Sequence, residues 1–241
     1  MASYAFSDLH GNYDLWKKIC ARTQPDDELY CLGDIIDRGN SGYKICLEMM
    51  KRPHMHFIKG NHEMMAVNAL PWLLKNEYHM RDVDMWLWNG GGKTWDEIEL
   101  INFDLSHPKF EKRVWKLIDW FREMATQIDI VNAKGQNVVL SHAGFTPEIW
   151  DEVGWDRNHF WDEWPKDYEN TYIIHGHTPV QYLAPALEQG RIDARIKIDR
   201  KAAPAVIEYA NGHKIDIDLG TIISNRIALI NLDTLEVTYI E

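Results

Sequence analysis

The chain has 241 residues, of which 45% are hydrophobic, and carries a formal net charge of −11. This length and composition suit one sizeable core and are short for two, so we expect a single domain over residues 1–241. The acidic balance argues against adhesion to anionic membranes and against non-specific binding of nucleic-acid polymers, because both use basic surfaces.

The first third of the chain alternates between strand and helix signals. Short apolar runs typical of buried strands occupy residues 4–6, 29–32 and 55–58. Apolar residues at helical spacing follow Asn12 and Ser41, two residue types that commonly cap the N-terminus of a helix. This β-α-β-α-β order predicts a mainly parallel central sheet.

Residues 64–127 have a mostly helical pattern, interrupted by Asn-Gly-Gly-Gly at residues 89–92. We expect this segment to be a helical insertion that forms a cap over the functional site. It is rich in tryptophan, for which two roles stay open. The favoured role is packing within the core and the cap, and the other is an aromatic wall beside the site that could stack a nucleobase.

Strand signals return at residues 137–140 and 171–174. The last third of the chain alternates polar and apolar residues, and its Asn211-Gly212 pair suggests a hairpin turn. We therefore predict an α/β fold in which two mixed β-sheets pack as a sandwich with helices outside.

The cysteines and the N-terminal residues bear on the cellular setting. Cys20, Cys31 and Cys46 form an odd set without C-x-x-C spacing, which predicts neither a disulfide framework nor a zinc knuckle. The first residues leave no room for a signal peptide, and no apolar run approaches the roughly 18 to 20 residues that span a bilayer. We expect a soluble protein of the reducing cytoplasm.

Five short polar blocks each follow a predicted strand. Loops at the carboxyl ends of strands in open α/β sheets converge on one site, so we expect the five blocks to meet. They are residues 8–11 (Asp-Leu-His-Gly), 33–39 (Gly-Asp-Ile-Ile-Asp-Arg-Gly), 60–63 (Gly-Asn-His-Glu), 142–144 (His-Ala-Gly) and 176–179 (Gly-His-Thr-Pro).

The order and chemistry of these blocks resemble the phosphoprotein-phosphatase branch of the calcineurin-like metallophosphoesterases. The small bacterial and phage Ser/Thr phosphatases are the most similar members, and the resemblance covers roughly the whole chain. An Asn-Gly-Gly stretch in a helical cap is also found in the bacterial relatives. The resemblance implies a four-layer sandwich and hydrolysis of phosphate esters that depends on two metal ions.

The residue types in the blocks suit two adjacent divalent cations. Asp8 and His10, two residues apart on one loop, can chelate one cation, and Asp34 is the natural bridge. Two such ions would acidify a shared water molecule and clamp a phosphate for in-line attack. Mixed oxygen and nitrogen ligands without a thiolate favour Mn²⁺, which we expect first, or Fe or Zn²⁺, over Ca²⁺. The ligands expected for the second cation are Asn61, His142 and His177.

The resemblance also assigns roles to four other residues. His62 matches the general acid that protonates the departing alkoxide, and Asp37 matches the carboxylate that orients it. Arg38 matches an arginine that binds the phosphoryl oxygens. A second phosphate-binding arginine of the family lies in a Trp-x-Arg stretch, which Arg157 matches here, and its rivals are Arg191, Arg195 and Arg200.

A few residues depart from the family pattern or lie beside it. Ser7 stands where a glycine is usual, and we expect it to alter the turn without touching a ligand. Pro179 replaces a histidine common in phosphodiesterases and nucleases, which favours a phosphomonoesterase. Glu63 is expected to orient backbone or ligands through hydrogen bonds, and His175 to pack within its strand or to support the ligands from behind.

Three functions remain open on the sequence alone. We favour removal of phosphate from phosphoserine or phosphothreonine in proteins, because residues 37–39 are intact. The alternative is a dinucleoside polyphosphate hydrolase acting on diadenosine tetraphosphate, with cap tryptophans stacking adenine. The third is a catalytically silent binding module, which we disfavour because no ligand is missing. The expected partner is a phosphoprotein or a phosphorylated small molecule.

Overall fold

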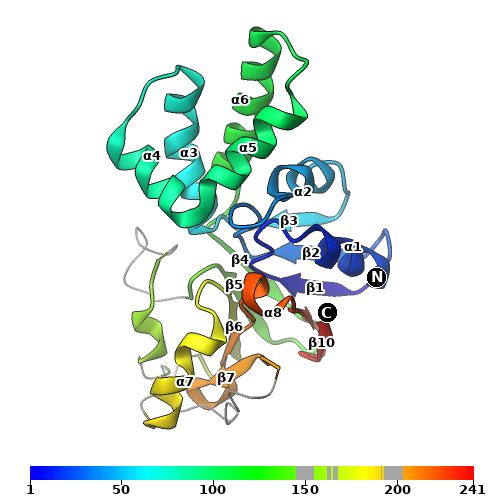
Figure 1. The fold of residues 1–241 in the computed structure, drawn as a ribbon. Coiled ribbons are helices and arrows are strands. Elements are labelled where there is room, and N and C mark those ends of the chain that lie inside the picture. The colour runs from blue at the N-terminus through cyan, green and yellow to red at the C-terminus, as the bar shows by residue number, and fades with distance from the viewer. Residues whose placement is uncertain (145–154, 162–163, 165–167, 191, 193–202) are drawn as a thin grey trace.

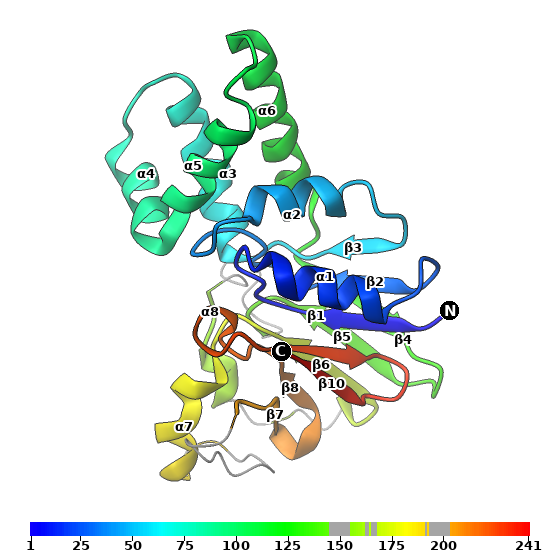
Figure 2. The same ribbon diagram turned by 45° about the vertical axis from the view of Figure 1, so that its right-hand side comes forward.

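A computed structural model of the chain describes all residues except 145–154, 162–163, 165–167, 191 and 193–202. It contains two five-stranded β-sheets that pack face to face (Figures 1 and 2). The predicted sandwich of two mixed sheets is therefore confirmed. The first sheet has the order β10 (Val237–Ile240), β9 (Ile227–Asn231), β1 (Ser3–Phe6), β2 (Glu28–Cys31) and β3 (Met55–Phe57).

The predicted parallel unit forms one half of the first sheet. Strands β1, β2 and β3 are mutually parallel, and helices α1 (Tyr13–Arg22) and α2 (Gly42–Met49) connect them. The Asn12 side chain accepts a hydrogen bond from the Leu15 N–H at 3.2 Å, as expected of a helix cap. Ser41 makes no such bond. At α2 the Glu97 carboxylate instead accepts from the backbone N–H groups of Tyr43 and Lys44.

The second sheet has three parallel strands flanked by two antiparallel ones. Its order is β4 (Gln127–Val131), β5 (Asn137–Ser141), β6 (Thr171–His175), β8 (Lys214–Asp216) and β7 (Ile207–Tyr209). The expected hairpin joins β7 to β8 through η4 (Ala210–Gly212), where Asn211 has a φ of 57°. Helices α7 (Val180–Glu188) and α8 (Thr221–Ser224) lie beyond the strand ends.

Apolar side chains from the facing sides of both sheets form one buried cluster. Ala5 and Ile230 come from the first sheet, and Leu140, Ile174 and Ile215 from the second. Side chains alternate between the two faces of a strand. On its other face the first sheet therefore packs a second cluster of buried apolar residues against α1 and α2.

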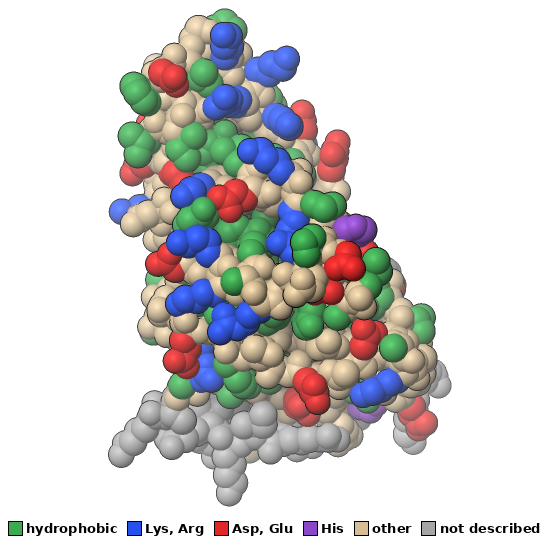
Figure 3. All heavy atoms as spheres, turned by 90° about the vertical axis from the view of Figure 1, so that its right-hand side faces the viewer, with side chains coloured by type: hydrophobic (Ala, Val, Ile, Leu, Met, Phe, Trp, Pro, Cys, Tyr) green, Lys and Arg blue, Asp and Glu red, His purple; other side chains and the backbone are tan. Residues whose placement is uncertain are grey.

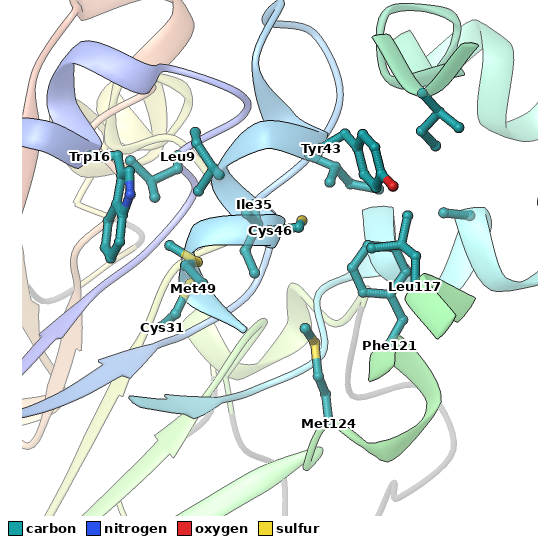
Figure 4. Close-up of a cluster of buried hydrophobic side chains, with 14 of the residues drawn as sticks. Leu9, Trp16, Cys31, Ile35, Tyr43, Cys46, Met49, Leu117, Phe121 and Met124 are labelled. Carbon is teal, nitrogen blue, oxygen red and sulfur yellow. The ribbon is translucent and has the colours of Figure 1, made fainter. Parts of the chain in front are cut away.

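Residues 61–123 rise above the first sheet as a group of helices, which we call the cap (Figure 1). Their elements are α3 (Asn61–Leu74), α4 (Met80–Trp86), η1 (Leu87–Gly91), α5 (Gly92–Ile101) and α6 (His107–Glu123). Figure 4 shows Leu117 and Phe121 next to Tyr43, so the core beside the first sheet continues into these helices. Trp86 is fully buried, whereas the side chain of Trp88 is 84% exposed. Most tryptophans of the cap therefore pack against the core, and Trp88 does not.

The surface seen in Figure 3 carries Lys and Arg side chains interspersed with Asp and Glu. Although the net charge is −11, the acidic side chains do not gather into one continuous patch on this face. Within the described part of the chain, every helix is too short or too polar to cross a bilayer.

Candidate metal centre

The five polar blocks meet at the carboxyl ends of β1, β2, β3, β5 and β6. Asp34 lies at the middle of the cluster: its Oδ2 is 3.6 Å from His10 Nε2, and its Oδ1 is 3.4 Å from His142 Nε2. Among the described residues, two groups could hold a metal ion, one with His10, Asp34 and His62 and the other with Asp34, His142 and His177. Asp34 belongs to both groups, as the bridging role requires. All six expected ligands are at most 7% exposed.

Two imidazoles are oriented so that their Nε2 lone pairs face the centre. The Nδ1 of His10 lies 3.0 Å from the Ile36 carbonyl, and the Nδ1 of His142 lies 2.7 Å from the Leu32 carbonyl. Each Nδ1 must carry the proton to donate to its carbonyl, which leaves Nε2 as an acceptor. Such backbone anchoring is the usual arrangement behind a metal-ligating histidine.

Several acceptor atoms in the centre lack a donor. His142 Nε2 lies 2.9 Å from Asn61 Oδ1, so two acceptors face each other. The same oxygen can accept from His177 Nδ1 at 3.0 Å, which leaves His177 Nε2 as an acceptor. Among the described residues, Asp8 Oδ1 and His177 Nε2 are buried without a hydrogen-bond partner. Unpaired buried acceptors are costly, and cations placed among them would satisfy them. The donor set therefore fits two divalent ions.

The expectation that Ser7 would not touch a metal ligand is wrong. Its Oγ donates a hydrogen bond to Asp8 Oδ2, so this residue does contact an expected ligand. Asp8 Oδ2 also accepts the backbone N–H of His177 at 3.1 Å. A Cβ at Gly176 would come within 2.1 Å of Ser7 Oγ and 2.2 Å of Asp8 Oδ2, which explains why only glycine fits there.

His62 and Asp37 form a closely hydrogen-bonded pair. His62 Nδ1 lies 2.6 Å from Asp37 Oδ2, and both side chains are 0% exposed. Burial lowers the pKa of His62 well below its usual value, and the positive charge of Arg38 adds to this. Burial raises the pKa of Asp37 to about 7, against the opposing hydrogen bonds from Thr94 and Trp86. The pair has the geometry of an imidazole oriented by a carboxylate.

Arg38 reaches the centre from an otherwise exposed position. Its two terminal nitrogens lie 2.7 Å from His10 Nε2 and 2.9 Å from His62 Nε2. The guanidinium thus sits between the two imidazoles, both of which belong to a group that could hold a metal ion.

Arg157 lies in the stretch just before η2 (Asn158–Phe160). Its positive charge helps to lower the pKa of His177, after the effects of burial and His142. The Trp155 ring meets the His177 ring edge-on at 5.9 Å. The rivals Arg191, Arg195 and Arg200 lie outside the described residues.

A family model described as calcineurin-like phosphoesterase matches residues 1–193. The chain belongs to this family. Among its relatives, the symmetrical bis(5'-nucleosyl)-tetraphosphatase of Pasteurella multocida is 28% identical over 156 residues, which are 63% of this chain and 46% of the relative. Serine/threonine-protein phosphatase 2 of Escherichia coli is 31% identical over 145 residues, which are 59% of this chain and 58% of the relative.

This calcineurin-like phosphoesterase therefore spans about half the length of the relatives that it matches. Among solved structures, it is similar to a metallophosphoesterase from Sphaerobacter thermophilus with a TM-score of 0.54 and 12% identity, over 100% of this chain and 89% of that one. At that identity the similarity shows the shared fold.

The phosphoesterase holds many residues of its centre in a left-handed backbone conformation. Each non-glycine residue in this region costs on the order of 1 kcal/mol or more, and such strain is common at functional sites. Backbone hydrogen bonds between the loops offset it, for example from the His10 N–H to the Asp34 carbonyl at 2.9 Å. The residues concerned are Asp8, His10, Asp34, Asp37, Arg38 and His177, with φ between 45° and 72°.

Two buried carboxylates beside the centre were not predicted from the sequence. Asp216 and Asp218 are 0% and 2% exposed, and the Asp218 N–H donates to Asp216 Oδ1 at 3.0 Å. Burial raises the pKa of Asp218 well above its usual value, and the nearby charge of Asp8 adds to this. Their only sequence signal was the alternation of polar and apolar residues, which equally describes an ordinary strand.

His175 is buried at the end of β6 behind the centre. Its Nε2 lies 2.7 Å from the Tyr209 hydroxyl, and His159 Nδ1 approaches the same hydroxyl at 2.8 Å. His175 therefore belongs to a polar network between strands, whereas Glu63 contacts the centre itself. The Glu63 carboxylate accepts from the N–H groups of Asp34, Ile35 and Gly60, which fixes two of the site loops as expected.

Proposed function

We propose that this phosphoesterase releases phosphate from phosphoserine and phosphothreonine in proteins with the help of two divalent cations. Asp8, His10 and Asp34 would hold one cation, and Asp34 would share the other with Asn61, His142 and His177. Mn²⁺ is the favoured metal, with Fe or Zn²⁺ as alternatives. When bound, the cations would supply positive charge for the phosphate and acidify an attacking water.

The observation that carries the proposal is the buried His62–Asp37 pair with Arg38 beside it. An alkoxide such as that of serine or threonine leaves poorly unless it receives a proton. Arg38 and Arg157 would bind the phosphoryl oxygens. His62, once protonated at Nε2 as well as at the Nδ1 that faces Asp37, would donate the Nε2 proton to the leaving oxygen. Asp37 would keep the imidazole in the orientation that presents Nε2 to the substrate.

The second candidate function is hydrolysis of a dinucleoside polyphosphate. The relative from Pasteurella multocida carries the name of such an enzyme, and two exposed tryptophans lie near the centre. Trp155 contacts His177, and Trp88 lies in η1, the turn whose Gly90 contacts Arg38. A nucleobase could stack on either ring. However, a nucleoside diphosphate leaves readily without a proton, so this function makes less use of the His62–Asp37 pair.

A rate comparison tests the proposal. The Mn²⁺-loaded protein is assayed at matched concentrations with a phosphothreonine peptide, diadenosine tetraphosphate and a bis-aryl phosphodiester. Faster turnover of the peptide supports the protein-phosphatase function. Faster turnover of the nucleotide overturns it in favour of the second candidate, and no turnover of any substrate with two metals bound would revive a silent binding module.

The proposed setting is the cytoplasm. Cys20, Cys31 and Cys46 are all free thiols, which suits a reducing compartment.

A further inference from the structure

Among the described residues, three side chains bond to the Asp37 carboxylate, and two of them lie in the helical cap. The Trp86 indole N–H donates to Oδ2 at 2.8 Å, and the Thr94 hydroxyl donates to Oδ1 at 2.7 Å. The third partner is His62 at Oδ2. Trp86 is the last residue of α4 and Thr94 lies in the first turn of α5, so the two donors flank the η1 turn.

The backbone of the Asp37-Arg38 turn is also held from the cap. The Asp37 N–H donates to Thr94 Oγ1 at 2.9 Å, and the Arg38 N–H donates to the Gly90 carbonyl at 3.2 Å. Asp37 and Arg38 have φ values of 71° and 65°, a conformation that side-chain-bearing residues rarely adopt. Both N–H groups of this strained turn therefore end on atoms of the cap.

These contacts fix the direction of the Asp37 carboxylate. Thr94 holds Oδ1 and Trp86 holds one lone pair of Oδ2, which leaves the other lone pair of Oδ2 for His62 Nδ1. Without the two cap donors the carboxylate could rotate about its terminal bond, because that torsion is broad. The imidazole of His62 would then lose its fixed orientation toward the leaving group.

We propose that Trp86 and Thr94 are positioning residues for proton donation by His62, so that the cap is part of the catalytic apparatus. The inference rests on the proposed role of His62 and deepens it. Neither residue touches the substrate. Their effect should be large where the leaving group needs a proton and small where it does not.

Two conservative variants separate positioning from packing. Trp86→Phe keeps an aromatic ring beside Gly91, where an added Cβ would lie 2.4 Å from the indole, and removes the N–H donor together with the second ring. Thr94→Val keeps the shape and removes the hydroxyl. Thr94→Ser returns the hydroxyl and serves as the rescue variant.

The readout is the ratio of turnover on a phosphothreonine peptide to turnover on p-nitrophenyl phosphate, whose leaving group needs little protonation. We expect this ratio to fall by about 10-fold or more in Trp86→Phe and Thr94→Val, since positioned proton transfer contributes roughly 10²–10⁴-fold. Thr94→Ser should restore it. Trp95→Phe, within the same cap, and Thr23→Val, a buried threonine bonded to the Ile19 carbonyl, should leave it unchanged.

The outcomes distinguish the inference from the function on which it rests. A wild-type protein inert on both substrates would overturn the proposed function, and a His62→Asn variant with an unchanged ratio would refute the role of His62. If His62→Asn lowers the ratio but Thr94→Val does not, the positioning role is wrong. Equal losses on both substrates in Thr94→Val would show that the hydroxyl serves only the structure. If Trp86→Phe does not fold, the comparison of Thr94→Val with Thr94→Ser is sufficient to test the inference.

Discussion

His62 is held from three directions by named groups. Its Nδ1 faces Asp37, its Nε2 faces Arg38, and its backbone N–H donates to Asp34 Oδ1 at 3.1 Å. The imidazole also lies in one of the two groups that could hold a metal ion, 3.8 Å from Asp34 Oδ2. Proton donor and metal ligand are therefore two distinct roles that the same geometry allows.

A His62→Asn variant separates these roles. We expect turnover of a phosphothreonine peptide to fall about 100-fold or more, because asparagine cannot donate a proton to the alkoxide. The protein should still bind two equivalents of Mn²⁺, measured by elemental analysis after gel filtration. Loss of one equivalent would instead identify His62 as a ligand.

Ser7 contributes a hydrogen bond to Asp8 that the family pattern did not predict. Ser7→Ala removes this bond and leaves Asp8 less constrained. Outer partners of metal ligands typically contribute about 10–100-fold to affinity, so we expect the affinity for Mn²⁺ to weaken about 10-fold. Isothermal titration calorimetry of the chelator-treated protein measures it. Ser41→Ala, which removes a hydroxyl without a capping bond, is the matched control. Equal affinities in the two variants would contradict the role of Ser7.

At the scale of elements, the N-terminus of α3 is locked to the loop after β2 by one side chain. Glu63 is 0% exposed and accepts three backbone N–H groups at 2.9–3.0 Å. Glu63→Gln replaces one accepting oxygen with an amino group that would face donors. We expect a loss of about 2 kcal/mol in the free energy of unfolding, measured in urea. The exposed control Glu123→Gln should change it little, and matching midpoints for both variants would refute the lock.

The strands and the first helix were predictable because their signals are local. The apolar runs of β1, β2 and β3 end at the polar blocks, and Asn12 caps α1 through a residue three positions away. The meeting of the blocks followed from the parallel order of the strands. No local pattern could reveal that Thr94 bonds to Asp37 across 57 positions, or that Glu97 caps α2 from another helix.

The left-handed residues of the centre were unpredictable for a related reason. Asp8 and His177 are not glycines, and their own sequence neighbours do not impose a positive φ. The conformation arises from hydrogen bonds between loops that are distant in sequence, such as that from the His177 N–H to Asp8 Oδ2. The buried pair Asp216 and Asp218 was missed because a strand pattern conceals carboxylates that tertiary packing later buries.

At the scale of the whole molecule, the centre concentrates negative charge in an already acidic chain. Burial raises the pKa of Asp34, and the neighbouring charges of Asp8 and Glu63 add to the effect. Bound cations would offset this repulsion in the folded state only. The stability of the protein should therefore depend strongly on metal.

We expect Mn²⁺ to raise the melting temperature of the chelator-treated protein. At a free concentration of 100 times the dissociation constant, a single site adds about 2.7 kcal/mol, which corresponds to roughly 5–10 °C for a chain of this size. Differential scanning calorimetry with and without Mn²⁺ measures the shift. His142→Ala should reduce it, and an unchanged melting temperature in the wild-type protein would argue against the centre as a metal site.

The first sheet joins residues from opposite ends of the sequence, since β1 lies between β2 and β9, with Tyr4 paired to Asn231 and Ala5 to Ile230. As the chain leaves the ribosome, β1 to β3 emerge early, but one edge of β1 stays unpaired until residues 227–231 have been synthesised. An open strand edge is a template for wrong pairing, and such late, long-range pairing slows folding. The nascent chain therefore exposes this edge of β1 to wrong pairing until residues 227–231 have been made.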